Sequence, residues 1–228
     1  MTRMHFVSAH FGGPAPWKHS IQSSSVEVST AYYTDDNTPS RHNAMTPRLK
    51  SKIPKMLEWQ SIESDWYVWM DSSLKLKDDV DDIPQQILKA AGNNPLCFFR
   101  HSDGTSIRRE VFRVLASIDN NHQYLIKRYG GEPLLEQTIH YYGDPDFRDN
   151  ELLAGTFFAY HRSAAPMLLD WFHHNVIWSI QDQISLPYVL QKSGLRYSLF
   201  EGRQWRESSV HVALERPGKQ PQGVDLHC

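Results

Sequence analysis

The sequence predicts an α/β fold with a mostly parallel central sheet. Short runs rich in valine, phenylalanine and tyrosine alternate along the chain with longer segments whose apolar residues recur at helical spacing. Such alternation is typical of strands that are joined by crossover helices. Apolar residues make up 40% of the 228 residues, which is enough to build a core between two layers. The length suggests one large domain, which we expect over residues 1–205, followed by a polar tail over residues 206–228.

The first half of the chain is expected to begin with two strands and to contain two helices. The expected order is a strand near residues 5–10, a strand over 26–33, a helix over 46–57, a strand over 66–70 and a helix within 76–92. Thr46 can cap the first helix, and Pro47 suits its first position. Pro54 predicts a kink or a break inside that helix, because proline lacks an amide hydrogen.

The second half continues the alternation. We expect a short strand over residues 95–99, a helix over 106–118, two short helices within 120–143, a strand over 152–161, two helices within 165–194 and a last strand over 196–200. From about Arg206 the sequence becomes polar, so the tail is expected to pack poorly unless a ligand orders it.

Composition and charge exclude several classes of protein. The chain carries 24 Lys and Arg against 26 Asp and Glu, so it has no basic excess that would bind a nucleic-acid backbone. Only two cysteines are present, which excludes a disulfide framework and predicts a reducing, cytoplasmic compartment. The N-terminus lacks the pattern of a signal peptide, and no apolar run approaches the roughly 20 residues of a membrane span. We therefore expect no integral membrane segment.

Asp71 closes the apolar run "WYVWM" and is the first candidate site residue. The common nucleotide, zinc-protease and esterase motifs are missing, so single residues at strand ends carry the chemical argument. In a parallel sheet, ligands bind beyond the carboxyl ends of the strands. A carboxylate there, followed by Ser72 and Ser73, can hold a divalent metal through oxygen ligands. The alternative is an Asp that caps the following turn.

Two further segments combine charge with helical spacing. Asp182 and Gln183 begin an apolar helical segment, where they could face a ligand or where Asp182 could cap the helix. Arg48 and Lys52 are four residues apart, so one helix face carries both charges. They could bind a diphosphate or form a solvated surface.

The chain has 12 histidines, several of which follow expected strands or helices. His140 and His161 are of this kind, and His211 and His227 near the C-terminus could complete a metal site. For each of them the alternative is a hydrogen-bonded residue without a functional role.

Taken in order, these segments resemble one family. The segments are "VSAHFGG", "YYTDDN", "RLKSKIPKML", "DWYVWMDSSLKL", "FFRHSDGTSIRREVF", "LLAGTFFAYHR" and "WSIQDQISLPYVL". Over roughly residues 5–200 the chain resembles TOD/MUCI-type glycosyltransferase-like domains, which are relatives of GT-A glycosyltransferases. The resemblance implies a single GT-A-like (Rossmann-like) domain that moves a sugar from a UDP- or GDP-sugar to a hydroxyl acceptor such as a glycan, with Mn²⁺ or Mg²⁺.

The resemblance also implies roles for individual residues. Arg48, Lys52, Asp71 and Ser73 would bind the donor, and Asp71 would hold the metal with His211 or His227. Asp182 and Gln183 would be catalytic, and His140, Gly155 and His161 would lie on the acceptor side. The sequence departs from the family at Ser73, where a second carboxylate is expected, and at Gln181, where the family has arginine.

Two other functions remain open at the level of sequence. A nucleotide- or sugar-binding domain without activity would explain Ser73 in place of a carboxylate. A phosphotransferase or phosphatase could use Asp71 as a nucleophile, although such enzymes usually carry a second Asp two residues further on. Sugar transfer fits the residue types because a metal and basic side chains stabilise a departing diphosphate, and a carboxylate such as Asp182 could activate an acceptor or steady a cationic sugar.

Overall fold

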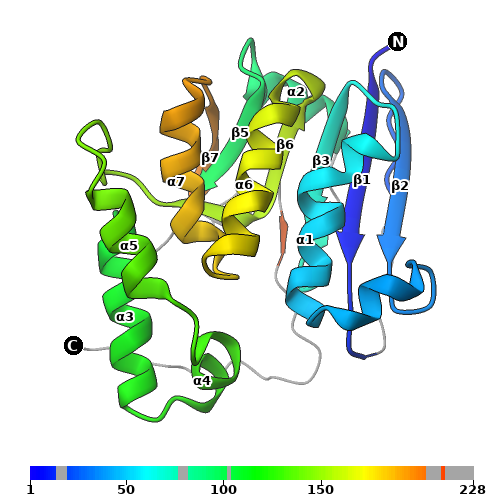
Figure 1. The fold of residues 1–228 in the computed structure, drawn as a ribbon. Coiled ribbons are helices and arrows are strands. Elements are labelled where there is room, and N and C mark those ends of the chain that lie inside the picture. Colours follow the sequence, from blue (N-terminus) through cyan, green and yellow to red (C-terminus); the bar gives the residue numbers. More distant parts are fainter. Residues whose placement is uncertain (14–19, 77–81, 102–103, 204–211, 214–228) are drawn as a thin grey trace.

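The computed structural model describes residues 1–13, 20–76, 82–101, 104–203 and 212–213 (Figure 1). A six-stranded sheet in the order β2-β1-β3-β6-β5-β7 forms its centre. The strands are β1 (Arg3–Ala9), β2 (Glu27–Tyr33), β3 (Trp66–Met70), β5 (Leu96–Arg100), β6 (Leu153–His161) and β7 (Ser198–Arg203). Five of them run in one direction, and β6 runs antiparallel to its neighbours β3 and β5. The predicted α/β fold with a mostly parallel sheet is confirmed.

Helices cover both faces of the sheet (Figure 1). One face carries α1 (Pro47–Leu57), α6 (Ala165–Ile177) and α7 (Asp182–Ser193), and the opposite face carries α2 (Ile83–Ala91). The helices α3 (Ile107–Asp119), α4 (Gln123–Tyr129) and α5 (Leu134–Tyr142) pack together as a helical lobe with its own apolar cluster. Three short 3₁₀ helices are η1 (Ser40–Ala44), η2 (Glu58–Gln60) and η3 (Arg162–Ala164).

Strand β3 explains why the run "WYVWM" is apolar throughout. Trp66, Val68 and Met70 pack on the α2 side, whereas Tyr67 and Trp69 pack on the side of α1 and α6. A strand that is buried on both faces reads as a continuous apolar run instead of an alternating one. By the same period of two, the residue after Met70 faces the α1 side.

Helix α1 begins as the sequence predicts. The Thr46 side chain accepts a hydrogen bond from the Leu49 amide at 3.3 Å, and Pro47 occupies the first helical position. The helix continues through Pro54 to Leu57, so the chain does not break there. The local cost is one missing amide donor, and the packing of α1 against α6 outweighs it.

Two short strands lie outside the central sheet. β4 (Lys75–Leu76) pairs antiparallel with β8 (Val212–Ala213), which falls within the predicted polar tail. The rest of that tail lies outside the described residues. Among the helices that the structure describes, none is sufficiently long and apolar to cross a bilayer.

Candidate functional site

Two adjoining cavities lie beyond the carboxyl ends of β1 and β3. The first has a volume of about 640 Å³ and the second of about 670 Å³. Their shared walls come from β3, α1, α4 and the segments that follow β3 and precede α7. The residues that line both cavities are Arg48, Ser51, Trp69, Asp71, Ser73, Arg128 and Ile180. We call the two cavities together the cleft, and its position is the usual one for ligands of α/β sheets.

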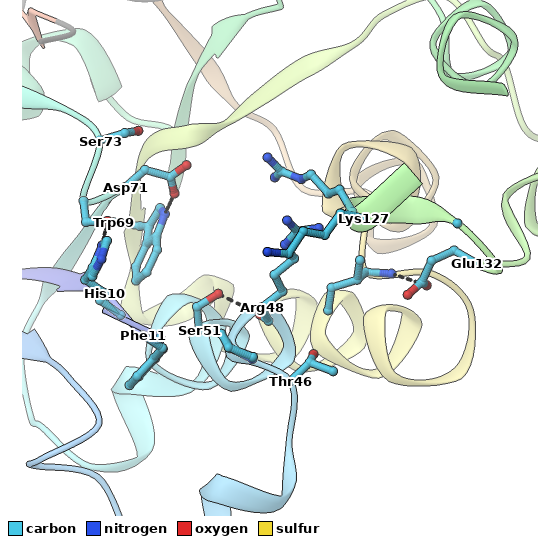
Figure 2. A pocket seen from close by; sticks show the side chains of 17 residues that line it. His10, Phe11, Thr46, Arg48, Ser51, Trp69, Asp71, Ser73, Lys127 and Glu132 are labelled. Carbon is cyan, nitrogen blue, oxygen red and sulfur yellow. Dashed lines mark hydrogen bonds between the residues drawn. The ribbon is translucent and has the colours of Figure 1, made fainter. Parts of the chain in front are cut away.

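Asp71 lines both cavities, and Figure 2 shows its side chain in the first of them. Its side chain continues the alternation of β3 on the α1 side, where the Trp69 indole donates a hydrogen bond to Oδ1 at 2.7 Å. The Asp71 amide donates to the Thr156 carbonyl at 2.8 Å and so ties the end of β3 to β6. The next residue, Ser72, has its hydroxyl 3.0 Å from Nδ1 of His10, at the end of β1. The position of Asp71 is therefore held by neutral groups.

Helix α1 presents three basic side chains to the cleft: Arg48, Lys52 and Lys55. Their spacing of four and three residues places them on one face of the helix. Lys52 donates to Oδ2 of Asp182 at 2.6 Å, and Lys55 makes a second short ion pair with the same oxygen. Asp182 is the first residue of α7, so this contact joins α1 to the start of α7.

The three groups of this contact are almost fully buried, and the pKa values of two of them, Asp182 and Lys52, are shifted. Burial acts against the charge of Asp182, but attraction to Lys52 and Lys55 outweighs it and holds the pKa of the carboxyl well below its usual range. Burial lowers the pKa of Lys52 to about 8, although Asp182 acts in the opposite direction. Asp182 is therefore ionised near neutral pH and is a weak base.

Figure 2 shows Arg48 of α1 and Lys127 of α4 on the opposite side of the first cavity from Asp71, and Arg128 of α4 also lines this cavity. The guanidinium of Arg128 lies 5.7 Å from the ring centre of Tyr124 and 5.2 Å from that of Tyr129, and it donates a hydrogen bond to the Tyr124 hydroxyl. Its Nε is buried and has no hydrogen-bond partner among the residues that the structure describes. Burial and then the like charge of Arg128 lower the pKa of Arg48. No salt bridge joins these three cations to a carboxylate among the described residues.

A further ion pair, between Glu110 and Arg113, lines the second cavity. Glu110 of α3 is 3% exposed and accepts two hydrogen bonds from Arg113, at 2.9 and 2.6 Å, and one from the Gln181 amide at 2.8 Å. Gln181, which directly precedes α7, replaces the arginine expected from the family resemblance. Its side-chain amide connects the start of α7 to α3 of the helical lobe through Glu110. Gln183, on the first turn of α7, lines the same cavity.

Gly155 of β6 lies directly against the Lys55–Asp182 contact. A Cβ atom at this position would lie 3.2 Å from Nζ of Lys55 and 3.4 Å from Oδ2 of Asp182. The glycine therefore lets two buried charges approach the backbone of β6.

The structure does not bring His140 or His161 to the cleft. His140 is exposed on α5, where its ring packs 4.9 Å from that of Trp178. His161 ends β6 and pairs with Trp66 at the start of β3. Because β6 is antiparallel, its carboxyl end lies at the opposite edge of the sheet from Asp71. His211 and His227 lie outside the described residues.

Sequence reasoning missed Lys55, Lys127 and Arg128. Lys55 could have been predicted from the sequence, because it lies three residues after Lys52 on the same face of the helix. Lys127 and Arg128 could not, because their approach to α1 depends on how the helical lobe packs. Within the described part of the chain, no three or more His, Cys, Asp or Glu side chains gather in a way that could hold a metal ion.

Comparison with known proteins gives structural neighbours only. No family model matches the chain, and no curated protein matches it. A glycosyltransferase involved in the glycosylation of the major capsid of PBCV-1 aligns with 10% identity and a TM-score of 0.48, over 86% of this chain and 80% of that one. Mouse xyloside xylosyltransferase 1, in its apo form, aligns with 8% identity and a TM-score of 0.34, over 74% of this chain and 60% of that one, so less than two thirds of its length is spanned. At these TM-scores the alignments carry no argument about activity.

Proposed function

We propose that this protein is a glycosyltransferase that moves a sugar from a UDP- or GDP-sugar to a hydroxyl acceptor such as a glycan. The observation that carries the proposal is the wall formed by Arg48, Lys127 and Arg128, which line the first cavity with Asp71 and form no salt bridge among the described residues. Glu132 and Asp182 attract Arg48 and Arg128 without forming an ion pair with them. Two arginines held close enough to repel one another are stabilised by an anion between them. A diphosphate supplies the charge and the bidentate oxygens that arginine prefers.

The oxygen atoms of Asp71 and Ser73 are suitable ligands for a divalent metal ion. Oδ1 accepts from Trp69, and Oδ2 accepts no hydrogen bond from a described residue. Mg²⁺ is commonly bound by one or two carboxylates together with substrate phosphates and water, so a single Asp beside Ser73 is sufficient in kind. When bound, Mn²⁺ or Mg²⁺ would neutralise charge on the diphosphate. Completion of the site by His211 or His227 remains a prediction.

The reaction needs little covalent chemistry from the protein. The bond between the anomeric carbon and a diphosphate oxygen breaks, and the diphosphate leaves with the electron pair. The acceptor oxygen forms the new bond to that carbon, and its proton passes to the departing diphosphate or to water. Arg48, Lys127 and Arg128 would stabilise the charge that develops on the leaving group.

The geometry favours a supporting role for Asp182. A carboxylate whose pKa is far below neutral is a poor acceptor for the proton of a hydroxyl. We therefore assign it the holding of Lys52 and Lys55 against the cleft. Gln183 lines the second cavity, where the sugar and the acceptor would meet.

The experiment is a measurement of UDP and GDP binding by calorimetry with Mn²⁺. Arg128→Gln should weaken nucleotide affinity at least tenfold, because it removes one charged contact to the diphosphate. Arg109→Gln, on an exposed part of α3 away from both cavities, is the matched control and should leave affinity unchanged. Equal affinity of the wild type and Arg128→Gln would remove the basis of the proposal.

A binding domain without activity is the second candidate, and Ser73 in place of the expected carboxylate is the observation in its favour. The same cation wall would hold a nucleotide in either case. Turnover of a panel of UDP- and GDP-sugars with Mn²⁺ separates the two. Binding of UDP without consumption of any donor, with glycans present as acceptors, would select the binding domain.

A further inference from the structure

The floor of the second cavity carries more positive than negative charge. Lys52 is 7% exposed and Lys55 is 4% exposed, and both point at a single oxygen of Asp182, which is 8% exposed. Two ammonium groups therefore share one carboxylate. Removing a charge from water costs several kcal/mol unless it is compensated, so this arrangement lacks one negative charge.

Neither of the other carboxylates that line the cavity, Glu110 and Asp71, forms an ion pair with the two lysines, and Asp71 exerts only the weakest of the attractions on Lys52. Glu110 is already bound by Arg113 and by the Gln181 amide. Asp71 accepts from Trp69 and forms no salt bridge with either lysine within the described residues. The pKa of Lys52, which burial lowers to about 8, is consistent with incomplete compensation.

The two lysines belong to the second cavity, which two members of the cation wall, Arg48 and Arg128, also line. Lys52 and Lys55 line the second cavity and not the first, whereas Lys127 lines the first and not the second. Gly155 lines the second cavity beside them and adds no side chain that would cover the ammonium group of Lys55. The second cavity thus offers a buried surplus cation to a ligand at the sugar side of the cleft.

We propose that the second cavity binds an oxyanion on the sugar substrate, the carboxylate of a uronic acid, with the ammonium group of Lys52 as its ligand. The proposal rests on the proposed function for the identity of the substrate as a sugar. The acid belongs either to the sugar of the donor or to the acceptor. In both cases the carboxylate contributes the negative charge that Asp182 alone does not provide.

The test compares glucuronate with glucose by ligand-observed NMR, and measures UDP separately on the same protein. Wild type should bind glucuronate and not glucose, and Lys52→Gln should weaken glucuronate binding at least tenfold while changing UDP affinity less than twofold. Lys89→Gln, an exposed lysine on α2, is the control and should change neither. Lys52→Arg keeps the positive charge and should retain glucuronate binding. This variant tests whether the loss of binding in Lys52→Gln comes from the missing charge or only from a weaker contact between α1 and α7.

Two results would overturn the inference. Glucuronate could fail to bind wild type, or Lys52→Gln could weaken UDP as strongly as Arg128→Gln does, which would place Lys52 in the diphosphate site. Binding of glucuronate without any binding of UDP would instead retain the oxyanion site and reject the proposed function. If UDP-glucuronate binds at least tenfold more tightly than UDP-glucose, and only with Lys52 present, the acid belongs to the donor. Equal binding of the two, with glucuronate still bound beside UDP, assigns it to the acceptor.

Discussion

Asp71 and Asp182 face the same cleft but are held in opposite ways. Asp71 follows a strand and receives one neutral side-chain donor, Trp69, whereas Asp182 begins a helix and receives two buried lysines. Oδ2 of Asp71 accepts no hydrogen bond from the described residues, whereas Asp182 forms the ion pairs that connect α1 to α7. A carboxylate at a cleft can thus serve a ligand or the protein's own structure, and its partners distinguish the two.

The largest expected difference between the two carboxylates is in how much each contributes to the stability of the protein. Asp182→Asn should lower the free energy of unfolding by about 3 kcal/mol, because it leaves two buried lysines without a counter-charge. Asp71→Asn should cost no more than about 1 kcal/mol, because the amide oxygen of Asn can still accept the hydrogen bond from Trp69. Urea unfolding at pH 7 measures both.

The pH dependence of the same variants sharpens that result. The pKa of Asp182 is lowered in the folded state, so its contribution is present above the pKa of an unfolded Asp, about 4, and is lost as pH falls below it. The difference in the free energy of unfolding between wild type and Asp182→Asn should therefore become smaller below pH 4. A difference that is absent at pH 7, or that equals the effect of Asp71→Asn, would contradict the assignment.

The next difference concerns metal. If Asp71 holds Mn²⁺ beside the diphosphate, wild type should bind UDP at least tenfold more tightly with Mn²⁺ than with a chelator. Asp71→Asn should reduce that ratio to about one, since an amide oxygen carries no charge. Calorimetry with and without metal gives the ratio. Asp36→Asn, an exposed loop position, serves as the control, and an unchanged ratio in Asp71→Asn would exclude Asp71 as a metal ligand.

If Lys52 binds the carboxylate of glucuronate, the affinity for glucuronate should depend on pH. The pKa of Lys52 is lowered to about 8, so its charge is present below that pH and is lost above it. Glucuronate affinity should fall by up to tenfold for each pH unit above 8. Lys52→Arg, which stays charged, should give a nearly flat profile up to pH 10. NMR titration at several pH values checks this, and a decline that is the same in both proteins would place the titrating group elsewhere.

A further small effect on stability is expected for Gly155→Ala. A methyl group there would press on Nζ of Lys55, at 3.2 Å, but the end of a lysine side chain can move by a few tenths of an ångström. Gly155→Ala should therefore destabilise the protein by no more than about 1 kcal/mol, whereas Gly155→Val should cost about 2 kcal/mol. Urea unfolding compares the two. Equal stability of all three proteins would show that β6 does not constrain the buried ion pairs.

Local patterns predicted most of the elements. Thr46 and Pro47 mark the start of α1 because capping and a preset backbone angle act within one turn. The run over Trp66–Met70 was predicted as a strand because aromatic and β-branched residues favour one wherever both faces are buried. Lys52 and Lys55 share a helix face for the same local reason. Their partner Asp182 lies more than 120 residues away, and helical spacing contains no information about it.

The sequence by itself determined the alternation of strands and helices, the start of α1 and the acid that follows β3, because each depends on residues within a few positions of one another. Only the tertiary structure decided the direction of β6, which takes His161 away from the cleft and brings Gly155 to it. It alone decided the pairing of two lysines with Asp182 and the approach of Arg128 to Arg48. The physical reason is that strand direction and ion pairing follow from contacts between segments far apart in the chain, where burial and charge are set by the whole fold.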